Sequence, residues 1–323
     1  MLAAVVHEPG GPEVLRIEER PVPQVRPGWV LVEIRAFGLN RSELITRAGG
    51  SGDAVKFPRV LGIECVGVVA DPSDARLERG QTFIAAMGGM GRDYDGGYEQ
   101  YALLPASQVI PVRTSLPWPQ LGAVPETFGT AWGSLDVLQL KEGETLLVRG
   151  ATSSVGMAAI TLAKDRGVRI IATTRQAAKR EALTANGADH VVLDDGRIAP
   201  QVRAIVPGGA DALLELVGPA TIADSFAALR AGARACLTGY LAADWDAEKA
   251  TAQAERAGIT LRRYSSGVIN RDSYGGIFQS IIDGIESGRY RINLDRTFPL
   301  SAIADAHRYM EANRAAGKVV GLP

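Results

Sequence analysis

Short apolar runs separated by glycine and proline fill the first third of the chain. Each run is only a few residues long and is followed by turn-forming residues, which is the pattern of strands in a β-rich domain. The runs that we expect to be strands cover residues 3–6, 30–35, 62–70, 81–86 and 98–103. The first third of the chain is therefore expected to form a compact, mostly β domain.

The pattern changes near Pro117, where helical periodicity begins to alternate with apolar strand-like runs. Strands are expected at residues 145–148, 168–174, 190–193, 212–217 and 233–239, and helices between Gly156 and Gly167, at 176–186 and at 221–230. Glycine follows each of these helices, as a C-terminal stop commonly does. Alternating strands and helices predict an α/β fold with a doubly wound parallel sheet. After about Tyr264 the pattern loosens, with helices expected at 277–287 and 303–313 and a last strand at 318–322.

Residues 144–175 read ETLLVRGATSSVGMAAITLAKDRGVRIIATTR and combine a strand, a turn of small residues, a helix and a second strand. Small residues let the backbone approach a pyrophosphate, and the helix N-terminus offers unpaired N–H groups to that anion. We therefore predict a dinucleotide site whose phosphate turn is formed by Thr152, Ser153, Ser154, Val155 and Gly156. The turn does not match the GxGxxG fingerprint. The alternative is a helix N-cap in a βαβ unit that binds nothing.

The end of the second strand, where the adenosine ribose would lie, carries Thr174 and Arg175, and Lys179 follows one helical turn later. Sites for NAD usually place an Asp or Glu there to bind the ribose hydroxyls. A carboxylate would repel a 2′-phosphate, whereas Arg175 can bind it bidentately. The sequence therefore predicts NADP(H), the alternative being an incidental basic pair on a solvated helix start.

Composition narrows the remaining classes of function. With 323 residues the chain is expected to form two domains. Its 35 basic and 36 acidic residues give a net charge of −1, which supports neither a nucleic-acid nor an anionic-membrane partner. No apolar run approaches the roughly 20 residues needed to span a bilayer, so we expect a cytoplasmic protein. Cys65 and Cys236 each lie in an apolar run and are expected to be buried thiols.

Six segments together carry a family resemblance: FGLNRSE (37–43), PRVLGIECVGVV (58–69), GGYEQYALLP (96–105), ETFGTAW (126–132), GATSSVG (150–156) and GADHVVLDD (187–195). Their order and spacing resemble the medium-chain dehydrogenase/reductase superfamily, and within it the zinc-independent, zeta-crystallin-like quinone oxidoreductase branch. The resemblance covers essentially the whole chain. It implies a GroES-like substrate domain at residues 1–122 and 264–323, and a Rossmann NADP(H)-binding domain at 123–263.

The resemblance also implies which residues form the site. Zinc alcohol dehydrogenases of the superfamily hold a catalytic metal with two cysteines and a histidine, and the matching positions here are Asn40, Ile63 and Glu126. A catalytic zinc needs three protein ligands and Ile63 has no donor atom, so no metal is expected. Catalytic candidates implied by the resemblance are Asn40, Thr130 and Glu126, and further cofactor contacts are Val217, Gly239, Tyr240, Ser265 and Ser266.

Each catalytic candidate has a plainer interpretation. Asn40 could be a turn residue, Thr130 a helix-interior residue and Glu126 the anchor of a salt bridge. Many quinone reductase relatives have a tyrosine five residues after the asparagine, but this chain has Ile45, so a tyrosine proton donor is absent at that position.

Without a Lewis acid to stabilise an alkoxide, two hydride transfers are favoured. One is reduction of a quinone by NADPH, and the other is reduction of the activated C=C bond of an enone or enoyl compound, as in secondary metabolism. A third hypothesis is an NADPH-binding sensor or structural protein without catalysis. The resemblance further implies a homodimer, which we expect to form through edge strands near residues 233–241.

Overall fold

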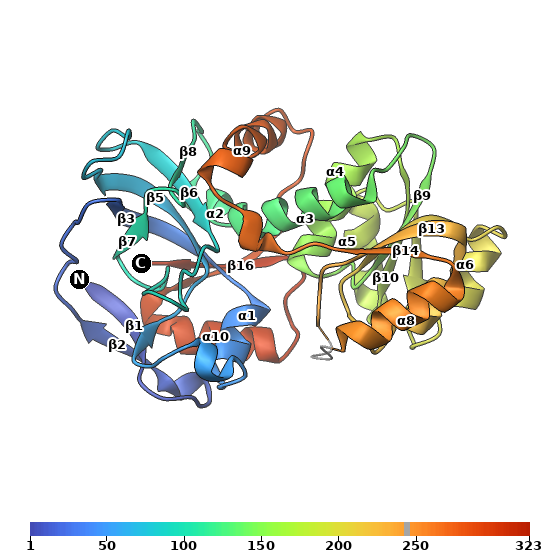
Figure 1. Ribbon diagram of the computed structural model, residues 1–323, viewed down its shortest axis with the longest axis horizontal. Coiled ribbons are helices and arrows are strands. Elements are labelled where there is room, and N and C mark those ends of the chain that lie inside the picture. The colour runs from blue at the N-terminus through green and yellow to red at the C-terminus, as the bar shows by residue number, and fades with distance from the viewer. Residues whose placement is uncertain (242–245) are drawn as a thin grey trace. The chain divides into compact units, whose positions relative to one another are not determined.

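The computed structural model describes residues 1–241 and 246–323 (Figure 1). The chain divides into two compact units. A β-rich unit comprises residues 1–129, 266–288 and 292–323, and a parallel-sheet unit comprises residues 130–265 and 289–291. Helix α3 (Pro125–Leu138) begins in the first unit and ends in the second.

The β-rich unit holds two sheets. Its strands are β1 (Leu2–Val6), β2 (Leu15–Glu19), β3 (Trp29–Leu39), β4 (Arg59–Val60), β5 (Glu64–Asp71), β6 (Thr82–Ala86), β7 (Tyr101–Pro105), β8 (Ile110–Pro111), β15 (Leu294–Pro299) and β16 (Lys318–Leu322). A three-stranded sheet has the order β2-β1-β4, and a seven-stranded sheet has the order β15-β16-β3-β5-β6-β8 with β7 also paired to β3. Antiparallel pairing of β16 with β3 brings the C-terminal segment back into this unit.

Among the described residues, the β-rich unit also contains four complete α-helices and an apolar core, to which α10 (Ile303–Glu311) contributes. The other three helices are α1 (Arg41–Arg47), α2 (Trp118–Leu121) and α9 (Arg271–Glu286). Phe37, Phe83 and Tyr98 are fully buried in the core, and Phe37 and Tyr98 pack with ring centroids 4.9 Å apart. The first half of the long β3 strand is buried at alternate positions, which helps to fix the register of the larger sheet, and its last four residues are all buried.

The parallel-sheet unit has one six-stranded sheet in the order β11-β10-β9-β12-β13-β14. The strands are β9 (Thr145–Arg149), β10 (Arg169–Thr174), β11 (His190–Leu193), β12 (Ala210–Glu215), β13 (Leu229–Leu237) and β14 (Thr260–Arg263). Its helices are α4 (Ser154–Asp165), α5 (Arg180–Ala185), α6 (Ala199–Ile205), α7 (Ile222–Ala227) and α8 (Ala247–Ala257). All of its strand pairs are parallel.

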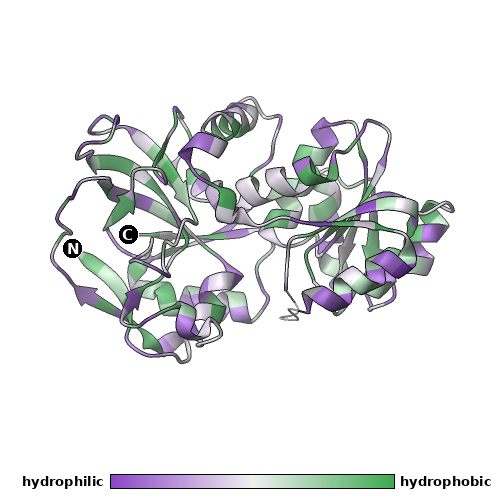
Figure 2. Ribbon diagram, in the orientation of Figure 1, coloured by the Kyte–Doolittle hydropathy of each residue, from purple (hydrophilic) through white to green (hydrophobic). Residues whose placement is uncertain are grey.

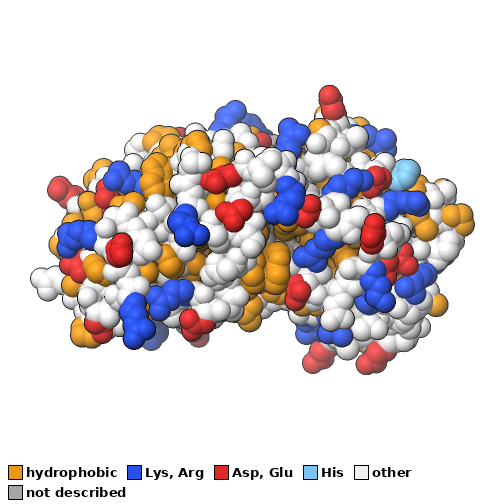
Figure 3. Space-filling view, turned by 90° about the horizontal axis from the view of Figure 1, so that it is seen from above, with side chains coloured by type: hydrophobic (Ala, Val, Ile, Leu, Met, Phe, Trp, Pro, Cys, Tyr) orange, Lys and Arg blue, Asp and Glu red, His pale blue; other side chains and the backbone are white. Residues whose placement is uncertain are grey.

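In this unit the interior strands of the sheet are more hydrophobic than the helix α8 (Figure 2). Every residue of β9 is buried, as expected for a strand covered on both faces. Hydrophobic residues gather on the strands and hydrophilic residues recur along α8 (Figure 2). Basic and acidic side chains are interspersed over the face in Figure 3, which accords with a net charge of −1.

The strand order places a topological switch point at β9. From β9 the chain runs through α4 to β10 on one side, and β12 pairs with β9 on the other side. Ligands of open parallel sheets bind at the carboxyl ends of the strands beside such a switch point. The expected α/β class, with a mostly-β unit and a unit built on a parallel sheet, is confirmed.

One predicted helix is wrong over its last three residues. The pattern predicted a helix at residues 221–230 with Gly232 as its stop, but α7 ends at Ala227. Leu229 pairs with Ala210 and begins β13, and Gly232 lies inside that strand at φ +67°. The start of this strand reads LRAGA and carries no strand periodicity of its own, so only its pairing with β12 defines it.

Other boundaries differ as well. The expected helix at 176–186 is split into a 3₁₀ turn at Ala177–Lys179 and the short α5, and the expected strand at 212–217 is shifted to Ala210–Glu215. Elements that the apolar pattern did not predict include β2, β14, α6 and α8. These segments are short or largely exposed, so they contain too few periodic apolar residues to predict a helix or a strand.

The predicted edge strand near residues 233–241 is also wrong. β13 is an interior strand, because β14 pairs with it from Arg234 to Leu237 and forms the border of the sheet. Among the described residues, no helix is long and apolar enough to cross a membrane. Cys65 and Cys236 are buried free thiols, as predicted.

Candidate functional site

The predicted phosphate turn joins β9 to α4. Gly150 lies at φ +82°, and a Cβ at Gly156 would come within 2.7 Å of the Ala151 backbone, so these positions require glycine. Ser153 is the N-cap of α4: its Oγ accepts the Gly156 N–H at 3.1 Å and donates to the Gly150 carbonyl at 2.9 Å. The Ser153 hydroxyl is thus already hydrogen-bonded within the turn.

Among the backbone donors left at this turn are two in the first turn of α4. The N–H groups of Ser154 and Val155 donate no hydrogen bond to the described part of the chain. Such first-turn N–H groups, together with the positive end of the helix dipole, are the usual elements of a phosphate site.

We expect Ser153→Ala to lower the free energy of unfolding by about 1 kcal/mol, because one first-turn N–H loses its cap. Urea unfolding of the purified protein measures the change. Ser154→Ala is the matched control, since Ser154 follows the cap as the first residue of α4 and caps nothing. Equal losses for the two variants would contradict the capping role.

The adenosine end predicted from the sequence lies on the neighbouring strand. Thr174 is the buried last residue of β10, and its hydroxyl bonds to the backbone of Gln176. Arg175 follows at the carboxyl end of the strand and is exposed, and Lys179 closes the 3₁₀ turn beyond it. The structure therefore puts the phosphate turn and Arg175 at the carboxyl ends of adjacent strands.

Further candidates follow β12 and β13. Val217 lies two residues past β12, where its N–H donates to Glu215 Oε1 at 2.8 Å. A Cβ at Gly239 would lie 2.2 Å from the Leu216 carbonyl oxygen, so only glycine permits this close approach of the two strand ends. Tyr240 follows directly. The Glu215 carbonyl accepts the Gly239 N–H, and its carboxylate accepts the Val217 N–H, so Glu215 holds both loops in place. This role was not recognised from the sequence, because Glu215 ends an apolar strand.

Helix α3 brings Thr130 into the parallel-sheet unit. Thr130 is buried, and its carbonyl accepts from Ser134 Oγ at 2.7 Å. The same Oγ lies 2.8 Å from Thr238 Oγ1, just past the carboxyl end of β13. Ser265 is also in this unit, whereas Ser266 belongs to the β-rich unit and starts a 3₁₀ turn.

Asn40 lies in the β-rich unit as the N-cap residue of α1 and is nearly buried. Its Nδ2 donates to Glu64 Oε1 at 2.8 Å and to Glu43 Oε1 at 3.3 Å, and its Oδ1 accepts from Lys318 Nζ. Both amide hydrogens are therefore used within the protein. Toward a ligand, the side chain can offer only the second lone pair of Oδ1.

An ion pair between Glu64 and Lys318 forms the centre of this cluster, with both side chains almost wholly buried. Glu64 Oε2 also accepts the Glu126 N–H at 2.8 Å. Asn40 and the Glu126 backbone thus both contact the buried Glu64–Lys318 ion pair within the β-rich unit. Lys318 was missed from the sequence, because a lysine before an apolar strand is more often exposed.

Glu43 is a buried acid in the same cluster. Burial raises its pKa to about 7, although the Ile63 N–H, Lys318 and Asn40 act in the opposite direction. Glu43 Oε1 accepts the Ile63 N–H at 3.1 Å, while Oε2 is buried and has no hydrogen-bond partner. The group therefore changes its protonation near neutral pH.

This raised pKa has a consequence for stability. The folded-state value of about 7 exceeds the ordinary value of 4.5, so the folded protein favours the protonated acid. The free energy of unfolding should fall as pH rises from about 4.5 through about 7. Glu43→Gln removes this titration, so wild type should lose stability relative to the variant across that window. Urea unfolding of both proteins at several pH values tests this, and parallel pH profiles would contradict it.

The zinc positions of related dehydrogenases do not fit a metal in this chain. Ile63 supplies no donor atom, and the Asn40 amide is held by Glu64 and the Lys318 ammonium. The described residues contain no group of three or more His, Cys, Asp or Glu that could hold a metal ion. The buried Lys318 ammonium also lies against Asn40, and its positive charge would repel a metal cation at this position.

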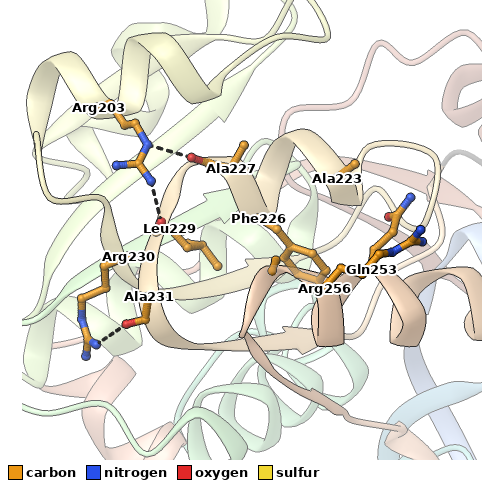
Figure 4. Close-up of a pocket in the computed structure, with 10 residues that line it drawn as sticks. Arg203, Ala223, Phe226, Ala227, Leu229, Arg230, Ala231, Gln253 and Arg256 are labelled. Carbon is orange, nitrogen blue, oxygen red and sulfur yellow. Dashed lines mark hydrogen bonds between the residues drawn. The ribbon is translucent and has the colours of Figure 1, made fainter.

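A pocket of about 480 Å³ lies elsewhere in the parallel-sheet unit, between α7, α8 and the start of β13 (Figure 4). Arg203 lines it and donates to the carbonyls of Ala227 and Leu229, as Figure 4 shows. The pocket is at the amino end of β13, whereas nucleotides bind at carboxyl ends. It is therefore distinct from the candidate nucleotide site.

Comparisons with known proteins agree with this geometry. Residues 26–114 match the family described as alcohol dehydrogenase GroES-like domain, and residues 186–320 match the family described as zinc-binding dehydrogenase. Human quinone oxidoreductase is 27% identical over 331 residues, covering 100% of this chain and 98% of the human protein. A phenolphthiocerol/phthiocerol polyketide synthase polypeptide of Mycobacterium tuberculosis is 29% identical over 98% of this chain, which spans 14% of that protein.

Solved structures show the same architecture over the full length. Mycobacterial Rv1454c complexed with NADPH has a TM-score of 0.88 at 27% identity, with 100% of both chains covered. Escherichia coli quinone oxidoreductase complexed with NADPH has a TM-score of 0.91 at 20% identity, again over 100% of both chains, and shows the shared fold. The chain is therefore an oxidoreductase that belongs to the medium-chain dehydrogenase/reductase superfamily, and the zeta-crystallin-like quinone oxidoreductase branch fits it.

Proposed function

We propose that this protein is an NADPH-dependent oxidoreductase that transfers hydride to a quinone or another conjugated carbonyl acceptor without zinc. The observation that carries the proposal is the carboxyl edge of the parallel sheet, where a capped phosphate turn lies beside the exposed Arg175. On this proposal, residues 123–263 form the NADP(H)-binding domain, and residues 1–122 and 264–323 form the substrate domain.

Binding of NADP(H) follows from the chemistry of this edge. The turn at residues 152–156 would bind the pyrophosphate through the Ser154 and Val155 N–H groups, and Arg175 would bind the adenosine 2′-phosphate with help from Lys179. The NADPH complex of the mycobacterial neighbour supports this choice of cofactor. Val217, Gly239, Tyr240, Ser265 and Ser266 are proposed to line the cofactor.

The residues proposed at the nicotinamide end act by positioning. Asn40, with both amide hydrogens engaged, would accept the carboxamide N–H of the nicotinamide through Oδ1. Thr130 would pack against the ring, and Glu126, whose backbone is fixed by Glu64, would orient the cofactor. The bound cofactor supplies the hydride, and the protein supplies orientation.

Quinones fit this machinery because their oxygens accept charge without a metal. The chain's similarity to human quinone oxidoreductase supports this acceptor. The similarity to a segment of a polyketide synthase supports a second candidate, reduction of an enoyl or enone C=C bond. A non-catalytic NADPH-binding protein is the third. A homodimer stays a proposal, for which β14 rather than β13 offers the exposed sheet edge.

Product identification tests the proposal. NADPH oxidation would be followed with a quinone, a panel of enones and a panel of 2-enoyl thioesters, and the products identified by mass. Turnover of the quinone alone supports the lead assignment. Saturated products from an enone or thioester would move the assignment to a C=C reductase, and NADPH binding without turnover of any acceptor would favour the non-catalytic alternative.

A further inference from the structure

A buried arginine at the end of β9 holds two acidic side chains. Arg149 is fully buried, and its Nε and Nη2 donate to the two carboxylate oxygens of Asp194, each at 2.9 Å. Its Nη1 donates to Asp224, to Ser225 Oγ and to the Thr221 carbonyl, each at 3.0 Å. All three guanidinium nitrogens therefore donate hydrogen bonds within the protein, and the bidentate geometry fixes the orientation of Asp194.

Asp194 lies beside the proposed 2′-phosphate position. β10 and β11 pair in parallel with Thr174 opposite Leu193, and the Asp194 N–H donates to the Thr174 carbonyl at 2.8 Å. Continuing this register puts Asp194 next to Arg175. Burial alone would raise the pKa of Asp194, but Arg149, the Gly196 N–H and the charge of Arg175 hold it below its ordinary value. The ionised form of Asp194 is thus favoured at the strand end next to Arg175.

A free carboxylate at this place would oppose the binding of NADPH. It would pair with Arg175 and repel the 2′-phosphate, just as the acid of an NAD site does. In the structure both Asp194 oxygens are taken by Arg149, and Arg175 makes no ion pair or hydrogen bond within the described residues. The buried arginine therefore leaves the exposed one available to a ligand.

We propose that Arg149 is a positioning residue for cofactor selectivity, which ties Asp194 back so that Arg175 can bind the 2′-phosphate. Asp194 is then a latent acid whose release would shift the site toward NADH. This inference rests on the proposed NADP(H) function of the same site, and it adds two residues that do not touch the cofactor in the proposed arrangement.

Three variants of the full chain test it: Arg149→Met, Asp194→Asn and the double variant. Dissociation constants for NADPH and NADH would be measured by quenching of tryptophan fluorescence. We expect Arg149→Met to weaken NADPH about tenfold or more, the effect of about 1.4 kcal/mol, without weakening NADH. The double variant should recover most of the NADPH affinity, because the released carboxylate is gone. Asp194→Asn alone should leave NADPH binding as tight as in wild type, or tighter.

The outcomes separate this inference from the proposed function. Equal weakening of both cofactors by Arg149→Met, without recovery in the double variant, would reduce Arg149 to a structural residue. If Arg149→Met does not fold, Asp194→Asn decides alone, since a loss of NADPH affinity there would show that Asp194 helps the 2′-phosphate site. A wild-type protein without NADPH preference would instead overturn the function on which the inference rests.

Discussion

Replacing Lys318 by methionine should lower the free energy of unfolding by about 3–5 kcal/mol, which is the usual effect of removing one partner of a buried ion pair. Lys318 is the cation that lies against Glu64 and Asn40, and both members of its ion pair are nearly inaccessible to water. Without the ammonium, the Glu64 carboxylate would stay buried beside Glu43, a second buried acid. Urea or thermal unfolding at neutral pH measures the loss.

A surface pair provides the matched control. Lys164 and Asp189 lie 2.6 Å apart, but their side chains are 49% and 31% exposed, so Lys164→Met should cost less than about 1 kcal/mol. Adding Glu64→Gln to Lys318→Met should recover part of the stability, because it removes the stranded charge. Similar losses for Lys318→Met and Lys164→Met would contradict the importance given to burial.

Replacing Arg175 by alanine should weaken NADPH binding by about 10- to 100-fold and leave NADH binding nearly unchanged. The range corresponds to the loss of charge-assisted hydrogen bonds to one phosphate, about 1.5–3 kcal/mol. The selectivity arises because the two cofactors differ only in the 2′-phosphate that Arg175 is proposed to bind. Steady-state kinetics with each cofactor, together with direct titration, would give the two affinities.

Arg169 supplies the control for this substitution. It is an exposed arginine on the same strand, at the amino end of β10 rather than the carboxyl end. Arg169→Ala removes the same charge from the protein far from the predicted phosphate, so the NADPH preference should persist. An unchanged preference in Arg175→Ala would remove the basis for assigning NADP(H).

The nucleotide edge could be predicted from sequence because its parts are local. Within residues 144–175, the apolar runs, small turn residues and glycine stops each predict their own element, and the expected strand, turn, helix and strand are present. The basic residue at the strand end is likewise found by counting along one βαβ unit. Such predictions need no knowledge of which distant segments meet.

The buried polar clusters could not be predicted in the same way. Lys318 and Asn40 are 278 positions apart, and only the return of β16 to β3 brings them together. Arg149 ends an apolar strand and carries no sign of its partners, since Asp194 and Asp224 come from two other segments. The error at residues 221–230 has the same origin, because strand pairing decides the structure where the local pattern is ambiguous.

Zinc-independent hydride transfer from NADPH is tested most directly by two readings on one purified sample. Zinc content would be measured by elemental analysis after treatment with a strong chelator, and the same sample would be assayed for NADPH oxidation with a conjugated carbonyl acceptor. We expect undiminished turnover in protein that holds far less than one zinc per chain, with NADPH preferred over NADH. Stoichiometric zinc whose removal abolishes turnover, and whose return restores it, would contradict a zinc-independent reaction.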